Sequence, residues 1–389
     1  MSIDQYLGRY AEAEAHLADR LDGHYRHVVV VPATDEAPSL VDGWLPKATL
    51  YILVVNGHDD QAASVHHQNA ETVAALRACF QTNPLAEGAW FGEQSDRALL
   101  LLDRSSPGRR LPRKQGVGLA RKIGFDVALA LYRRGRVARR FLVSTDADAT
   151  LPAELLNVGV APDVVALTHR FTHVPGGDSA VDEAHRLYEM YLRYYVAGLR
   201  WAGSPYAHFS IGSTLAVDAN AYANVRGFPK RAAGEDFHLL NKARKLGPFA
   251  TPDTPPIRIR ARRSARVPFG TGPATAAMDR ARYCLPHPEL FECLREVLEG
   301  LPGWAVHLQR NPTSTPPGRP AVQEALHAMG VPEGLARAVR NAPPHQLALR
   351  VHEWFDGLKT RQLLRRLEAV YPAQPWQVSL KEAELRFPL

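Results

Sequence analysis

Two aspartates separated by a single residue, Asp146 and Asp148, directly follow a short apolar run at residues 141–143. Side chains alternate between the faces of an extended strand, so both carboxylates can point the same way from its end. Like charges held this close repel unless a cation lies between them or each has its own partner. Oxygen ligands on a loop suit a hard divalent ion such as Mg²⁺ or Mn²⁺, especially one shared with a diphosphate. The alternative is that an aspartate caps the helix predicted at residues 151–156.

A second acidic pair, Glu235 and Asp236, follows Gly234 at the point where another helix is predicted to begin. Acidic side chains in the first turn of a helix are common because they interact favourably with the helix dipole. Taken alone, this pair indicates a helix start and no particular chemistry.

The elements that must position these residues alternate between strands and helices. Buried strands are predicted at residues 27–32, 48–56, 98–103 and 141–143, and helices at residues 3–21, 66–79 and 119–134. The first two strands end in polar residues, among them Thr34, Glu36 and Asn56. This alternation indicates an α/β protein with a doubly wound sheet, and such sheets bind ligands at the carboxyl ends of their strands.

A basic segment that contains glycines, residues 109–124, leads into the helix predicted at residues 119–134. It has neither the GKS/T ending of a phosphate-binding P-loop nor a GxGxxG directly after a strand. The start of the helix, together with Arg121 and Lys122, could face an anion. A solvated basic loop is the alternative.

The composition is that of a globular protein with excess positive charge. Hydrophobic residues make up 46% and charged residues 22% of the 389 positions, so wholesale disorder is not expected. The net charge of +7 favours anionic partners, such as nucleotide phosphates, phosphorylated acceptors, a lipid surface or nucleic acid. The basic runs lack the interleaved aromatic residues that single-strand binding would use, so we expect no nucleic-acid partner.

Cysteine usage and hydropathy bear on the location of the protein. Cys79, Cys284 and Cys293 show no CxxC spacing and cannot all pair, which favours buried thiols in a reducing, cytoplasmic setting. The N-terminus lacks the basic region and apolar run of a signal peptide. No window approaches 18 consecutive apolar residues, so we expect no transmembrane segment and at most peripheral membrane contact.

Read in order, the motifs of this chain resemble those of family 2 glycosyltransferases with the GT-A fold, a Rossmann-like, doubly wound mixed sheet. The resemblance covers residues 25–270. The matching segments are VVPATDE at 30–36, VVNG at 54–57, ARKIG at 120–124, TDAD at 145–148, GSTLA at 212–216, RGFP at 226–229 and GEDF at 234–237.

The resemblance implies a metal-dependent, non-processive hexosyltransferase. Such an enzyme moves a sugar from a nucleotide-diphosphate sugar to a hydroxyl of a small-molecule or lipid-linked acceptor, here with inversion. Asp146 and Asp148 would hold the divalent metal, Mg²⁺ or Mn²⁺, and His238 or His208 would be a third ligand. The implied nucleotide-binding residues are Pro32, Thr34, Glu36, Asn56, Arg121 and Asp146. The implied general base is Asp236, with Glu235 beside it at the acceptor site.

The chain also departs from the family pattern. Asn56 and Gly57 stand where family members commonly carry an acidic pair, and Lys122 stands where asparagine is usual. The QxxRW signature of processive members is absent, so a polysaccharide synthase is not expected. In its place is an arginine-rich segment with a Gly-Thr-Gly turn, residues 257–272. It could close over the diphosphate, or it could be a charged edge strand.

Two alternatives remain for the function. One is a retaining synthase of a small glycoside of the sugar-glycerate type. The other is a non-catalytic GT-A protein that only binds its ligand. Both acidic pairs are intact, which favours an enzyme.

The last part of the chain is predicted to be an all-helical extension without a catalytic motif. Its predicted helices span residues 289–298, 321–329, 335–339 and 347–370. It could pack on the transferase domain, form a homodimer or meet anionic lipid through basic residues of its last helix. The predicted division is an N-terminal helix at 1–24, a GT-A domain at 25–275 and the helical extension at 276–389.

Overall fold

The computed structural model describes residues 1–43, 48–94, 97–263, 275, 278, 280–311 and 314–388. The chain divides into two compact units. Unit 1 comprises Met1–Asp182 and Ser210–Ala276, and unit 2 comprises Glu183–Phe209 and Ala277–Leu389. This division differs from the sequence-based one, because residues 1–24 belong to unit 1 and residues 183–209 belong with the C-terminal helices. The break falls inside helix α4, Ser179–Trp201.

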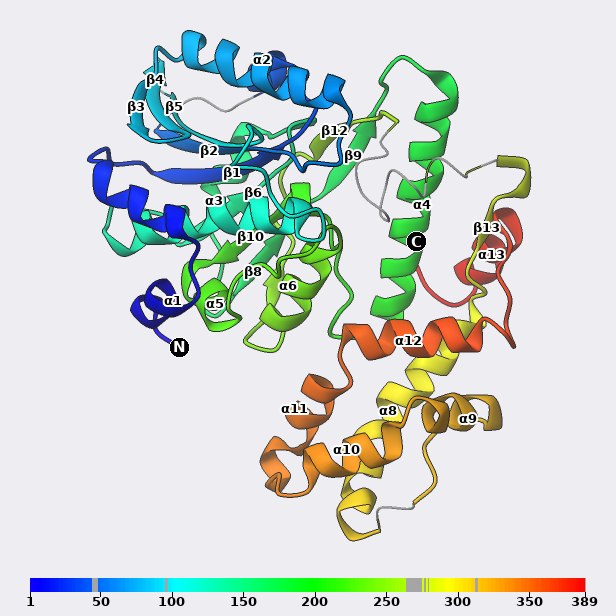
Figure 1. Ribbon diagram of the computed structural model, residues 1–389. Helices are drawn as coiled ribbons and strands as arrows, with labels where there is room; N and C mark the ends of the chain where they lie inside the picture. Colours follow the sequence, from blue (N-terminus) through cyan, green and yellow to red (C-terminus); the bar gives the residue numbers. More distant parts are fainter. Residues whose placement is uncertain are drawn as a thin grey trace. The chain divides into compact units, whose positions relative to one another are not determined.

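Unit 1 is an α/β unit built on a mixed, nine-stranded sheet with the order β11-β8-β10-β6-β1-β2-β5-β4-β3 (Figure 1). The central strands β6, β1, β2 and β5 run parallel to one another. Strand β10 is antiparallel to both of its neighbours. The strands are β1 His27–Ala33, β2 Thr49–Asn56, β3 Asn83–Ala86, β4 Ala89–Gln94, β5 Arg97–Arg104, β6 Phe141–Ser144, β8 Ala166–Thr168, β10 Leu215–Asp218 and β11 Phe249–Ala250.

The predicted buried strands are confirmed, and a helix packs on each face of the sheet. Helix α3, Gly116–Arg133, packs on one face, and α2, Ala63–Cys79, lies on the other (Figure 1). Gly124 of α3 lies so close to Val30 of β1 that a larger side chain would collide with it. The hairpin β3–β4 was missed, because its residues are only partly buried and do not form an apolar run.

The strand register brings the predicted site segments to one edge of the sheet. Val30 of β1 pairs with Ser144 of β6, and Pro32 pairs with Val54 of β2. The residues that follow these three parallel strands therefore meet at their common carboxyl edge. Pro32 itself is buried within β1, and a contact between it and a nucleotide stays a prediction.

A second, three-stranded sheet lies beside Asp148. Its strands are β7 Ala149–Thr150, β12 Ile257–Arg260 and β9 Phe171–Val174, and β12 is the middle one. The Arg260 amide donates to the Asp148 carbonyl over 3.0 Å. The first four residues of the arginine-rich segment thus form a strand, while the Gly-Thr-Gly turn at 270–272 lies outside the described residues.

The single N-terminal helix predicted at residues 3–21 is wrong. Helix α1 spans Ile3–Arg9, and a separate 3₁₀ helix spans Ala13–Arg20. The helical conformation is interrupted between them, where the Glu12 amide donates to the buried carboxylate of Asp126 over 2.8 Å. A long-range polar contact of this kind has no signature in the local apolar spacing.

Asp126 is the centre of a buried polar cluster that also explains Lys122. The Lys122 ammonium donates to Asp126 over 2.8 Å and to the Tyr6 hydroxyl over 2.6 Å. The Tyr6 and Tyr222 hydroxyls both donate to Asp126. Lys122 therefore ties the N-terminal residues to α3, and the anion that it faces is a carboxylate of the protein itself.

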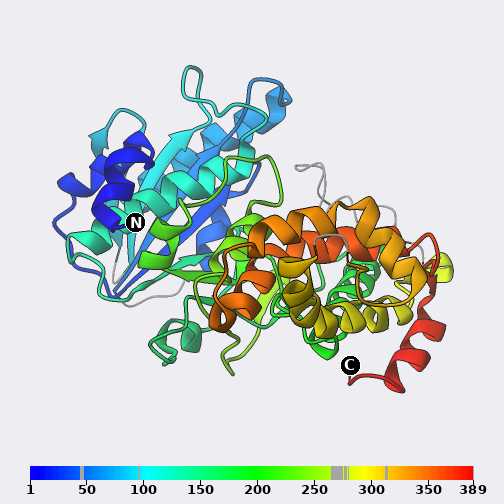
Figure 2. The ribbon, with the colours of Figure 1, turned by 90° about the horizontal axis from the view of Figure 1, so that it is seen from below.

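Unit 2 is helical, with its own apolar core around α8, Glu289–Arg310. Figures 1 and 2 show the yellow-to-red helices gathered about α8, which α10, α11 and α12 all contact. The other helices are α9 Pro320–Ala328, α10 Val331–Val339, α11 Pro344–Trp354, α12 Gly357–Leu367 and α13 Trp376–Glu384, and the strands β13 Cys284–Leu285 and β14 Gln374–Pro375 pair.

The single helix predicted at residues 347–370 is also wrong. Asp356 separates α11 from α12, and its side chain accepts the Leu358 and Lys359 amides as the N-cap of α12. The basic side of α12, with Arg361, Arg365 and Arg366, is exposed. Contact of that side with lipid stays a prediction.

Helix hydropathy and cysteine burial bear on the predicted setting of the protein. None of the helices in the described ranges is long and apolar enough to cross a membrane. All three cysteines are unpaired, but only Cys293 is buried, so the expectation of buried thiols is wrong for Cys79 and Cys284.

We predict that Asp126→Ala destabilises unit 1 strongly. The substitution leaves the buried ammonium and two hydroxyls without their acceptor, and breaking a buried pair in this way costs about 3–5 kcal/mol. Urea unfolding followed by circular dichroism measures the loss. Asp19→Ala is the matched control, because it removes an exposed partner of Arg134 and should cost less than about 1 kcal/mol. Equal losses for the two variants would contradict the role of the cluster.

Candidate functional site

The buried guanidinium of Arg121 joins the two acidic pairs. Its Nε donates to Glu235 Oε1 over 2.9 Å, and its Nη2 donates to Asp146 Oδ1 over 2.5 Å. Its Nη1 donates to Ser144 Oγ over 2.6 Å and to the carbonyls of Thr145 and Gly212. Two acidic segments far apart in the sequence therefore meet at one cation.

Local structure brings each partner to Arg121. The residue lies in the second turn of α3, on the face that packs against the sheet, and only 3% of its surface is exposed. Ser144 and Asp146 point to the same side because they are two positions apart at the end of β6. Gly212 lies against the guanidinium, and a Cβ there would occupy its place. The anions that Arg121 faces are therefore carboxylates of the protein itself, and nucleotide binding by Arg121 stays a prediction.

The two aspartates after β6 pair with different cations. The strand ends at Ser144, and the chain turns so that the Ala149 amide donates to the Asp146 carbonyl. Asp148 consequently binds a different cation, with its Oδ2 accepting from Arg262 Nε over 2.6 Å. The alternative role as a helix cap is wrong, because Pro152 is the N-cap of the 3₁₀ helix Ala153–Asn157 and no side chain caps it.

Arg262 also binds Glu36, which follows β1. Its Nη2 donates to Glu36 Oε1 over 2.7 Å, and its Nη1 donates to Oε2 over 3.2 Å. One guanidinium thus forks onto Glu36 and holds Asp148 with its third nitrogen. The resemblance implies that Glu36 binds the nucleotide. No sequence pattern predicts its ion pair with Arg262, which lies 226 positions later in the chain.

Glu235 and Asp236 open helix α6, Glu235–Ala243. Gly234 at the N-cap has φ 71°, a left-handed conformation that glycine adopts without strain. Glu235 is buried against Arg121, whereas Asp236 is half-buried and accepts the Phe237 amide over 2.7 Å. Desolvation, with the negative charge of Glu235 beside it, raises the pKa of Asp236 to about 7.

The ends of β1 and β2 are joined by a residue that the sequence analysis missed. The Asn69 side chain, buried in α2, donates to the Asn56 carbonyl over 3.2 Å and accepts the Asp35 amide over 2.8 Å. Thr34 is held nearby through a hydrogen bond from Gln61 over 3.3 Å. A polar residue on the buried stripe of α2, in line with Val73 and Leu76, was the available signal.

The donor set fits a divalent metal in part. The ion pairs with Arg121 and Arg262 use Asp146 Oδ1 and Asp148 Oδ2, so one oxygen of each carboxylate lies outside them. Two carboxylate oxygens suit Mg²⁺ or Mn²⁺ when a diphosphate and water supply the other ligands. Metal binding by these two aspartates stays a prediction.

A third protein ligand is not brought to the aspartates. Over the described ranges, no group of three or more His, Cys, Asp or Glu side chains is arranged to hold a metal ion. His238 lies two positions after Asp236 in α6, which turns it about 200° around the helix axis. Its ring lies beside Phe237, and His208 belongs to unit 2.

The charge balance around the two arginines favours a further cation. Among the described residues, five carboxylates, those of Glu36, Asp146, Asp148, Glu235 and Asp236, face two guanidiniums. When all are ionised, negative charges exceed positive ones by three. An anionic diphosphate could bind here only with additional positive charge beside it.

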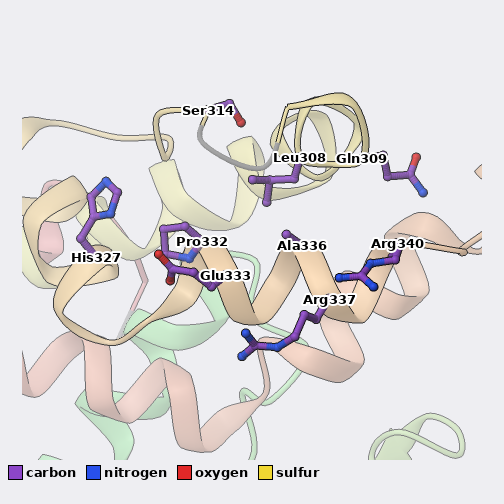
Figure 3. Close-up of a pocket in the computed structure, with 9 residues that line it drawn as sticks. All are labelled: Leu308, Gln309, Ser314, His327, Pro332, Glu333, Ala336, Arg337 and Arg340. Carbon is purple, nitrogen blue, oxygen red and sulfur yellow. The ribbon is translucent and has the colours of Figure 1, made fainter.

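Unit 2 contains a hollow of about 500 Å³ between α8 and α10 (Figure 3). Its apolar lining comes from Leu308, Pro332 and Ala336, and exposed Arg337 and Arg340 stand at its side. Ser314, His327 and Glu333 also line the hollow. The candidate catalytic site is nevertheless the one in unit 1, because two acidic segments converge there on one buried arginine.

Comparison with protein-family models and with curated proteins finds no match to this chain.

We predict that Asp236 titrates near pH 7 and that Glu235→Gln lowers its pKa by roughly one to two units. The reason is that the substitution removes the neighbouring negative charge that disfavours ionisation of Asp236. Carboxyl ¹³C NMR of the two proteins measures the shift. Glu154→Gln, at an exposed position of unit 1, is the control and should leave the titration unchanged. An Asp236 pKa near 4 in the wild type would contradict the prediction.

Proposed function

We propose that unit 1 is a glycosyltransferase of the GT-A type, which moves a sugar from a nucleotide-diphosphate sugar to a hydroxyl acceptor. The observation that carries the proposal is the convergence of Asp146 and Glu235 on Arg121. This places the acidic pair after β6 and the acidic pair of α6 in one site. That site lies at the carboxyl edge of parallel strands, where α/β sheets bind their ligands.

The chemistry of the reaction assigns a role to each part of the site. Displacing a nucleoside diphosphate builds negative charge on the leaving phosphate. A divalent metal held by Asp146 and Asp148 would neutralise that charge. Asp236 accepts the proton of the acceptor hydroxyl, and Arg121 fixes Glu235 beside it. The nucleoside binds at the ends of β1 and β2, next to Thr34 and Asn56.

The state of Asp236 favours inversion over the retaining alternative. A carboxylate with a pKa near neutrality is a suitable general base, since it is ionised at working pH and still accepts a proton readily. Because the base must be ionised, activity should rise with pH through about 7.

We predict that a screen of nucleotide sugars with Mn²⁺ finds one whose nucleoside diphosphate is released, and that Asp236→Asn slows this release by about 10²–10⁴-fold. The amide keeps the shape of the side chain but cannot take a proton. Asp253→Asn is the matched control, because its carboxylate is exposed and pairs only with the surface residue Arg170. Full activity of Asp236→Asn would rule out its role as the base.

The configuration of the product separates the inverting and retaining alternatives. With a single base opposite the leaving group, we expect the anomeric configuration of the donor to be inverted. Proton NMR of the anomeric position in the glycoside product measures it. A product with the donor's configuration would favour the retaining synthase instead.

A further inference from the structure

Arg262 forms an ion pair with Asp148, the carboxylate that the proposed reaction needs as a ligand of its metal ion. Its side chain bridges Asp148 and Glu36 through all three guanidinium nitrogens, at 2.6, 2.7 and 3.2 Å. The side chain of Asp148 is only 17% exposed and that of Glu36 only 12%, so water does little to screen the charge of either carboxylate. In this arrangement a cation already lies between two carboxylates at the edge of the sheet.

The backbone fixes Arg262 at this position. The amides of Arg260 and Ala261 donate to the carbonyls of Asp148 and Val174, which aligns the end of β12 with β7 and β9. The next residue, Arg262, therefore starts within reach of Asp148. Arg263 turns to the other side, where it is 80% exposed and pairs with Asp178.

The two arginines of the site differ in how firmly they are held. Arg121 is almost completely buried, and its partners include two main-chain carbonyls that cannot move away independently. Arg262 is 27% exposed, and its bonds to the described residues go to side-chain carboxylates. A guanidinium fork also fits a phosphate group as well as it fits a carboxylate. Arg262 is thus the cation that an incoming diphosphate can take over.

We propose that Arg262 is a built-in counter-ion that blocks divalent metal binding at Asp148 in the donor-free protein. It releases Asp148 when a nucleoside diphosphate binds its guanidinium. This inference rests on the proposed function for the identity of the diphosphate ligand. It makes metal and donor binding interdependent, because each removes what opposes the other. Arg262 is a positioning residue in this scheme and takes no part in bond formation.

The test is a calorimetric titration of the full chain with MnCl₂, without nucleotide. Arg262→Ala should bind Mn²⁺ at least about tenfold more tightly than the wild type, because a positive charge beside the ligand is removed. Arg262→Lys, which keeps the charge, should resemble the wild type. A residue with a purely structural role would not yield tighter binding when it is removed.

Matched variants locate the effect. Arg263→Ala removes the same charge one residue away and should leave Mn²⁺ affinity unchanged. Asp148→Asn introduced into Arg262→Ala should abolish the gain. If Arg262→Ala proves unfolded by circular dichroism, Arg262→Gln carries the same prediction. No gain in either variant, or an equal gain in Arg263→Ala, would overturn the proposal.

A second titration, with UDP or GDP present, tests the exchange. The nucleotide should raise the Mn²⁺ affinity of the wild type and bring it close to that of Arg262→Ala. A difference that neither nucleotide reduces would refute the release step. These measurements need no turnover. Tighter Mn²⁺ binding without any sugar transfer would refute only the proposed function, and transfer without tighter binding would refute only the role of Arg262.

Discussion

The candidate site depends on one buried cation, the guanidinium of Arg121. Removing such a charge from water costs several kcal/mol unless its donors are satisfied. Here Glu235, Asp146, Ser144 and two carbonyls satisfy them. These partners come from β6, from the segment at Gly212 and from the first turn of α6. The site therefore exists only when all of these elements have assembled, and a shift in any of them would leave a buried donor of the guanidinium without its acceptor.

The elements of unit 1 could be predicted from the sequence because their signals are local. The strands β1, β2 and β5 are continuous apolar runs, and burial on both faces of a sheet requires such runs. The helix breaks at Glu12 and Asp356 were missed because polar contacts, and not a change in apolar spacing, decide them. In both places the apolar pattern continues past the break.

The site was predictable only in part, for a related reason. The positions of Asp146 and Asp236 next to a strand end and a helix start are visible in the sequence. The partners of Glu235 and Asp148 are not, because these ion pairs join residues 114 positions apart and have no local pattern. Arg121 and Arg262 both lie in basic segments of the sequence. Nothing in those segments indicates that Arg121 is buried against Asp146 and Glu235, or that the partly exposed Arg262 pairs with Asp148 and Glu36.

Because α4 begins in unit 1 and ends in unit 2, the two units are not consecutive pieces of chain. Tyr194 and Leu199 of α4 pack in the core of unit 2, where Tyr194 lies 5.7 Å from the ring of Phe291. A gene truncated after residue 276 would encode α4 without that core and leave its apolar face uncovered. Unit 2 therefore cannot be deleted without consequence for the rest of the chain. Its surface can vary in evolution, but its loss would expose the apolar residues of α4 and favour aggregation.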